Sequence, residues 1–74
     1  MAIRQQTRLS PSEARAVRLF VDGASIQEVA DDLGVAYETA RTFLRRSREK
    51  YRRNGRSAST RTELRESFYA DRAR

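Results

Sequence analysis

Repeated helix-start signals constrain the fold of this chain more than any other feature of its sequence. Ser10-Pro11-Ser12-Glu13 and Ser25-Ile26-Gln27-Glu28 are capping boxes, in which a serine hydroxyl and a glutamate three residues later bond the free N–H groups of a first helical turn. Thr60-Arg61-Thr62-Glu63 is a further box of this kind. Gly23 and Gly34 follow the first two predicted helices, where a left-handed residue closes a helix. The sequence therefore predicts an all-α fold.

These signals and the spacing of apolar residues predict the helix boundaries. We expect a three- to four-helix bundle with helices over residues 11–22, 26–33, 36–52 and 60–71. The third helix begins near Ala36, which has no side-chain oxygen to cap it. Its buried face is predicted to consist of Ala40, Phe43, Leu44, Ser47 and Tyr51. That face is predicted to pack on Val17, Phe20, Val29, Ala30 and Leu33. Because 74 residues support one core, we expect one domain over residues 9–74 after a flexible arm over residues 1–8.

Composition argues against several classes of function. Apolar residues make up 38% of the chain and charged residues 35%, and no apolar run is long enough to span a membrane. The chain has no Cys and no His, so we expect no metal, no cofactor and no enzymatic activity. The N-terminus also lacks the apolar stretch of a secretory signal. We expect a cytoplasmic protein, associated with the nucleoid of a prokaryote or its phage.

The charge of the chain is strongly segregated. Sixteen Lys and Arg against ten Asp and Glu give a net charge of +6, which favours a polyanionic partner. Between residues 20 and 40 the ionised side chains are all acidic, namely Asp22, Glu28, Asp31, Asp32 and Glu38. Residues 41–61 contain nine basic side chains and only Glu49 as an acid. One end of the fold is therefore expected to be basic and a neighbouring patch acidic.

A short helix, a glycine turn and a longer basic helix are the pattern of a helix-turn-helix, whose second helix lies in the major groove of DNA. Arg41, Arg45, Arg48 and Arg52 fall within roughly 60° of one another on that second helix. The alternative is an ordinary solvated charged face. The separate location of the acidic residues, and the absence of Glu-to-Arg pairs spaced by four residues, favour a DNA-binding stripe.

The residue order also resembles a known family, the LuxR-type (GerE-like) helix-turn-helix domain. The resemblance is carried by Leu9-Ser10-Pro11-Ser12-Glu13, by residues 17–23, by residues 25–35 and, in the third helix, by Thr39-Ala40-Arg41-Thr42-Phe43. Region four of bacterial sigma factors shares much of this pattern, including the Leu-Ser-Pro start and the Leu-Gly-Val turn. The fourth capping box and an apolar stripe of Leu64 and Phe68 favour the LuxR-type interpretation, since a sigma region generally ends after its recognition helix.

The resemblance implies which side chains contact DNA. Arg41, Thr42 and Arg45 match positions that reach bases or phosphates in the family, and Thr39 matches one that bonds a phosphate. Glu38 is a further candidate for reading a base, as an acceptor from a cytosine amine, although a carboxylate there also complements a helix N-terminus. The remaining phosphate candidates are Tyr37, Arg46, Arg48, Arg52, Arg53 and Arg56. An ordinary exposed tyrosine and a solvated loop are the alternatives at Tyr37 and at residues 52–56.

The fourth helix commonly supplies a dimer contact in the family that the chain resembles. We assign Leu64 to the core of the monomer, and Phe68 and Tyr69 to a homodimer contact. The connection between Tyr51 and Arg61 is about five residues longer than the family's usual turn, which makes the dimer mode an open question.

The sequence thus predicts a transcriptional regulator that binds double-stranded DNA sequence-specifically through residues 37–52. The alternative is a protein-interaction module that docks on RNA polymerase or another regulator through Asp22, Asp31 and Asp32. A basic helix can also bind a membrane surface, but the apolar strip beside the arginines has few large side chains, so we expect no membrane partner.

Overall fold

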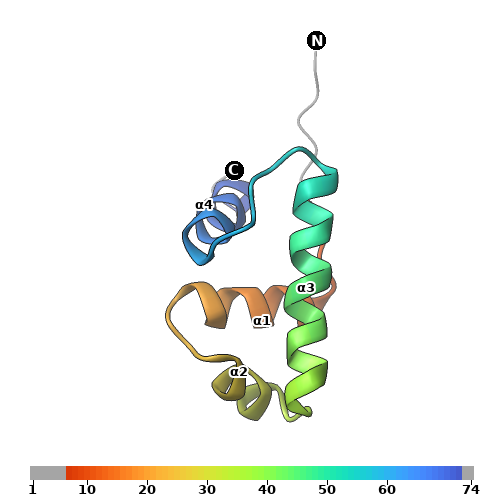
Figure 1. The fold of residues 1–74 in the computed structure, drawn as a ribbon, viewed down its shortest axis with the longest axis vertical. Helices are drawn as coiled ribbons and strands as arrows, with labels where there is room; N and C mark the ends of the chain where they lie inside the picture. Colours follow the sequence, from red (N-terminus) through yellow and green to blue (C-terminus); the bar gives the residue numbers. More distant parts are fainter. Residues whose placement is uncertain (1–6, 73–74) are drawn as a thin grey trace.

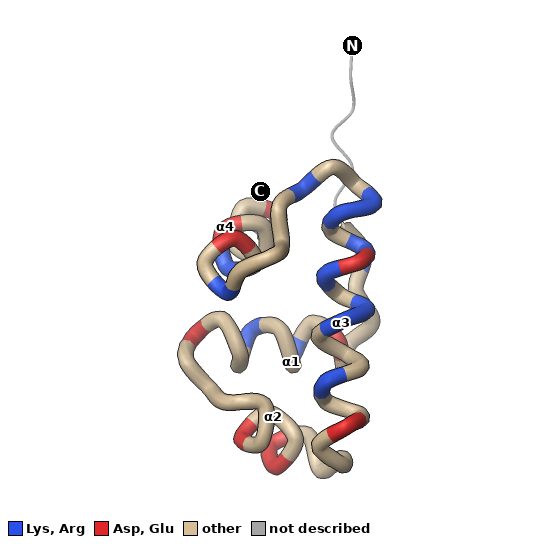
Figure 2. The backbone as a smooth tube through the Cα atoms, viewed as in Figure 1, with Lys and Arg blue, Asp and Glu red and all other residues tan. Residues whose placement is uncertain are grey.

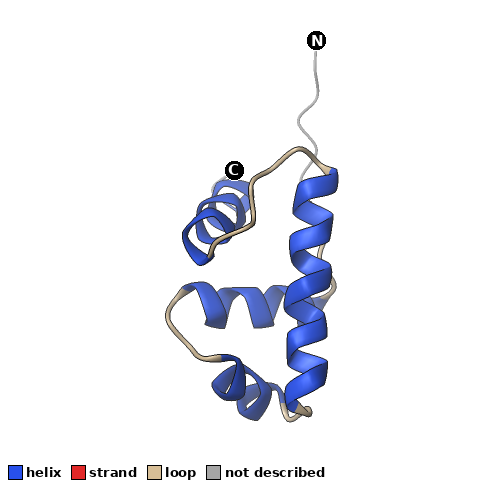
Figure 3. Cartoon of the chain, in the orientation of Figure 1, coloured by secondary structure: helices blue, strands red, loops and turns tan. Residues whose placement is uncertain are grey.

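A computed structural model describes residues 7–72 of the chain. It contains α1 (Pro11–Val21), α2 (Ile26–Leu33), α3 (Tyr37–Arg53) and α4 (Arg61–Arg72), joined by loops (Figures 1 and 3). The predicted all-α fold is confirmed, and every predicted helix boundary lies within one residue of the observed one. Within the described residues, no helix is both long and apolar enough to cross a membrane.

The helix ends have the chemistry that the sequence predicts. Ser10 and Glu13 cap α1 with a complete capping box, and Ser25 and Glu28 do the same for α2. At α4, the Glu63 N–H donates to Thr60 Oγ1 at 3.1 Å, and the Glu63 carboxylate accepts from the Ser59 N–H at 2.9 Å. Each such cap contributes on the order of 1 kcal/mol. The helices are therefore fixed largely by interactions between residues close in sequence.

Helix α3 is the longest element and runs along one side of the molecule, with α1 crossing its middle (Figure 1). Helix α2 packs on α1 and on the first part of α3, whereas α4 packs on α1. The side chains that form the common core are Ala16, Val17, Phe20, Val21, Val29, Ala30, Ala40, Leu44, Tyr51, Ala58, Leu64 and Phe68. Leu33 and Phe43, predicted in the core, are only partly buried at its edge.

Phe68 corrects one prediction. Its position on the fourth helix predicts a homodimer contact, but only 1% of its surface is exposed. The guanidinium carbon of Arg72 lies 4.2 Å from its centroid and further covers the ring. Phe68 therefore belongs to the core of the monomer together with Leu64, as α4 must bury an apolar face on α1 to be stable.

A buried ion pair holds the connection between α3 and α4. Arg56 Nη2 lies 2.6 Å from Asp71 Oδ1, and both side chains are largely buried. The second carboxylate oxygen of Asp71 accepts from the Thr7 N–H at 3.0 Å, and Asn54 Nδ2 donates to Thr7 Oγ1 at 2.9 Å. Thr7 is itself buried, so this part of the predicted flexible arm is fixed against α4, and residues 1–6 lie outside the described part.

A second long-range interaction joins α1 to the last turns of α3. Lys50 Nζ lies 2.6 Å from Glu13 Oε1, the same oxygen that accepts from the Ser10 N–H in the capping box. Burial alone would raise the pKa of Glu13, but the hydrogen bonds from Lys50 and Ser10 outweigh it and lower the pKa below its ordinary value. One carboxylate therefore both starts α1 and anchors it to α3.

We expect Asp71→Asn to lower the free energy of unfolding by about 3 kcal/mol, because it leaves the buried guanidinium of Arg56 without a counter-charge. Urea unfolding followed by circular dichroism measures this loss. Asp31→Asn, at an exposed carboxylate of α2, is the matched control and should change stability little. Equal stabilities for the two variants would contradict a structural role for the buried pair.

Acid should weaken the junction of α1 with α3. Because the pKa of Glu13 is lowered in the folded state, its contribution is complete above the ordinary value of 4.5 and is lost as the pH falls through the lower folded-state pKa. We expect Glu13→Gln to cost about 1–2 kcal/mol at pH 7 and to flatten the stability profile below pH 4.5. Unfolding curves across this pH range test it, with the exposed Glu66→Gln as control; a variant profile as steep as that of the parent would refute it.

Candidate DNA-binding surface

The turn between α2 and α3 sets the angle at which α3 is presented. Gly34 ends α2 with φ 69° and ψ 35°, a left-handed conformation that favours glycine. The N–H groups of Gly34 and Val35 donate to carbonyls in the last turn of α2, at 3.2 and 3.0 Å. Ala36 then begins α3 without a side-chain cap, as predicted. The two helices and this short turn form a helix-turn-helix.

Helix α3 buries one face and presents the other to solvent. Ala40, Leu44, Ser47 and Tyr51 form its buried face, while Arg41, Arg45 and Arg52 are exposed. Figure 2 shows basic residues along the length of α3 and acidic residues on α2. The charge segregation seen in sequence is thus a separation in space.

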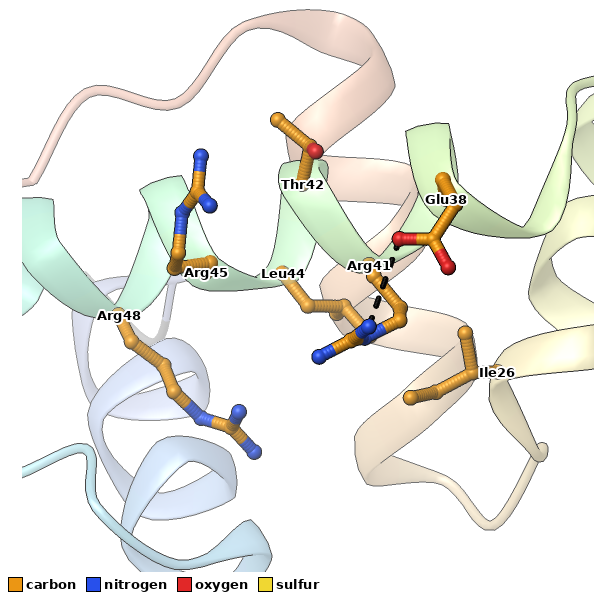
Figure 4. Close-up of a pocket in the computed structure, with 7 residues that line it drawn as sticks. All are labelled: Ile26, Glu38, Arg41, Thr42, Leu44, Arg45 and Arg48. Atoms are coloured by element: carbon orange, nitrogen blue, oxygen red, sulfur yellow. Dashed lines mark hydrogen bonds and ion pairs between the residues drawn. The ribbon is translucent and has the colours of Figure 1, made fainter.

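A pocket of about 260 Å³ lies on the exposed side of the helix-turn-helix, where α3 passes the start of α2. Its lining consists of Ile26, Glu38, Arg41, Thr42, Leu44, Arg45 and Arg48 (Figure 4). All four side chains predicted to read bases line this pocket, together with Arg48, a predicted phosphate contact, but Thr42 and Arg45 project on the other side of α3 from Arg41 (Figure 4). Sequence reasoning missed Ile26, the first residue of α2, because its place beside α3 depends on how the two helices pack.

Within this pocket the cations are free of strong internal pairing. Arg41 Nη1 lies 3.4 Å from Glu38 Oε1, and both side chains are more than half exposed (Figure 4). Such a pair contributes little in water and is easily exchanged for an external anion. Arg45 forms no ion pair within residues 7–72, and its side chain projects from α3 on the other side from that of Arg41 in Figure 4.

The other predicted phosphate contacts divide into two groups. Tyr37, Thr39, Arg46, Arg52 and Arg53 are all exposed on α3. Arg46 follows Arg45 by about 100° around the helix and does not line the pocket. Arg56 instead faces inward, where its ion pair with Asp71 leaves 17% of its side chain exposed. The prediction that Arg56 clamps phosphate is therefore wrong, because its charge is already neutralised within the fold.

The acidic residues proposed as an alternative contact surface have partners inside the molecule. Arg15 Nη2 lies 2.8 Å from Asp32 Oδ2, and Gln27 Nε2 donates to Asp31 Oδ1 at 2.9 Å. The Tyr69 hydroxyl donates to the Asp22 carboxylate at 2.8 Å, and this hydrogen bond, followed by desolvation, raises the pKa of the tyrosine. These three carboxylates are therefore exposed and paired with neighbouring side chains of the same molecule.

The fold and the basic face of α3 define a helix-turn-helix protein of the DNA-binding class. Residues 6–50 match the family described as Sigma-70, region 4, and the chain belongs to that family. Its members are DNA-binding domains of transcription and are not an enzyme class. The match ends within α3, before α4, and it does not confirm the LuxR-type assignment. No curated protein and no solved structure matches the chain.

The turn offers a direct test of how α3 is held. A Cβ at Gly34 would have no atom within 4 Å, so a substitution there is penalised only by the left-handed backbone. We expect Gly34→Ala to lower the free energy of unfolding by about 1 kcal/mol and Gly34→Asn to lower it less, because asparagine tolerates this conformation. Thermal unfolding distinguishes the two variants, and an alanine variant as stable as the parent would contradict the role of this turn.

Proposed function

We propose that this protein binds double-stranded DNA sequence-specifically and regulates transcription by occupying promoter DNA, with the exposed face of α3 in the major groove. The observation that carries the proposal is that Glu38, Arg41, Thr42 and Arg45 all line one pocket, where α3 passes the start of α2. Membership of the Sigma-70 region 4 family supports it independently.

The arrangement suggests a division of labour along α3. Arg41 and Arg45 are suited to bidentate hydrogen bonds with guanine. The Thr42 hydroxyl can donate to a base or accept from one, and the Glu38 carboxylate can accept from a cytosine amine. Elsewhere on the exposed surface of α3, Tyr37, Thr39, Arg46, Arg52 and Arg53 are proposed to bond phosphates. Phosphate contacts would fix the register of α3, and the side chains in the pocket would then read the sequence.

A single module of this size buries only about 600–1,000 Å² against DNA, so a partner would add useful specificity. We propose RNA polymerase as that partner, because the chain belongs to a region of sigma factors. A homodimer on two half-sites stays a prediction that now depends on Tyr69, which is 38% exposed, since Phe68 is buried.

Selection of duplexes from a random pool tests sequence-specific binding. We expect a consensus sequence to emerge, and its affinity to fall about a thousandfold between 50 and 200 mM salt if six phosphates are contacted. Palindromic half-sites would indicate a homodimer, whereas a single site would favour binding with a protein partner. Absence of any consensus, or binding that does not respond to salt, would refute the proposal.

Substitutions separate the two kinds of contact. On the selected duplex, Arg45→Ala should lose about tenfold or more in affinity and relax discrimination at one base pair, because a bidentate contact to a base is worth about 1–3 kcal/mol. Arg52→Ala should weaken binding to all DNA sequences similarly and reduce the slope of log affinity against log salt concentration by about 1. Arg65→Ala, on α4 and away from the pocket, is the control; parental specificity in the Arg45 variant would argue against α3 as the reading helix.

A further inference from the structure

We infer that α4 takes part in DNA binding, because Arg61 forms with Arg48 a second phosphate-binding site beside the pocket on α3. This inference rests on the proposed function and deepens it. Arg61 lies outside the matched residues 6–50 and is not among the contacts predicted from sequence. Its ligand is the sugar-phosphate backbone at one edge of the major groove.

Two arginines from different helices converge on one aromatic ring. The guanidinium carbon of Arg61 lies 4.2 Å from the centroid of Phe20, and that of Arg48 lies 5.5 Å from the same centroid. The two carbons are thus no farther apart than the sum of these distances, which is less than a Debye length of about 10 Å at 0.1 M salt. The two charges are close enough to raise the local potential together.

Neither guanidinium has a counter-charge within residues 7–72. The ion pairs there involve Arg15, Arg41, Lys50 and Arg56, and the buried Nε of Arg48 has no hydrogen-bond partner. Arg61 donates only a long bond of 3.5 Å to the carbonyl of Ala24. Phe20 supplies a favourable surface for both cations but no negative charge. A phosphate bound beside them would relieve their mutual repulsion and accept hydrogen bonds from both.

The surroundings of this pair fit a DNA backbone better than a free anion. Arg48 also lines the pocket that contains Arg41 and Arg45, so the new site continues the basic surface of α3 (Figure 4). Arg61 also donates to the carbonyl of Ala24, so the new site lies beside the loop that precedes α2. Arg48 of α3 and Arg61 of α4 therefore place two cations beside the pocket, where a DNA strand bound to α3 can reach them.

The experiment compares Arg61→Met with Arg65→Met, which removes the same charge one turn along α4. Methionine retains packing over Phe20 while losing the cation. Binding to a labelled duplex of about 30 base pairs carrying the selected consensus is measured against salt concentration. We expect Arg61→Met to bind about tenfold more weakly, and its slope of log affinity against log salt concentration to be smaller by about 1. Arg65→Met should bind like the parent. Equal losses in both variants, or none in Arg61→Met, would overturn the inference.

A third variant separates phosphate binding from a purely structural role. Arg61→Lys keeps the charge but loses the planar stacking on Phe20, so we expect a lower melting temperature with the salt slope retained. A salt slope reduced as far as in Arg61→Met would show that Arg61 acts only by holding α4, and would overturn the inference. If the parent and the Arg45 variant bind DNA as proposed and Arg61→Met binds as tightly as the parent, only this inference is overturned. If the parent does not bind DNA, the proposed function itself is overturned.

Discussion

The packing of α1 across the middle of α3 is the constraint on which the rest of the structure depends. Helix α2 reaches its place beside the first half of α3 only because α1 and a short turn deliver it there, and α4 packs on α1. The junction is secured by apolar burial and by the Glu13–Lys50 ion pair near the end of α3. With one face of α3 committed to this contact, the opposite face and its arginines must point to solvent.

Sequence reasoning succeeds where structure is determined by neighbours in the chain. The capping residues of α1, α2 and α4 act over three residues, and the boundaries that they predict agree with the structure. That Arg41, Thr42 and Arg45 line one pocket is also predictable, because they share one helix whose buried face is evident from its apolar spacing.

Prediction from sequence fails where the side chain that determines a residue's environment is distant in the chain. Arg56 belongs to a run of basic residues in sequence, and nothing nearby indicates that Asp71 neutralises it. Phe68 has the spacing of an interface residue, but the burial of its ring depends on how α4 returns to α1. Arg61 belongs in sequence to a basic run and to a capping box, but its position over Phe20 depends on how α4 packs on α1. The family match identifies the DNA-binding unit but ends before α4, so this helix has to be interpreted from its contacts.

The bond between Thr7 and Asp71 has a consequence for synthesis of the chain. Thr7 is made 64 residues before its partner, and it cannot be buried until α4 has left the ribosome. Helices α1, α2 and α3 contain the whole helix-turn-helix and can associate earlier, through contacts of shorter separation. The separation of these contacts along the chain therefore favours association of α1, α2 and α3 before the segment at Thr7 is fixed on α4.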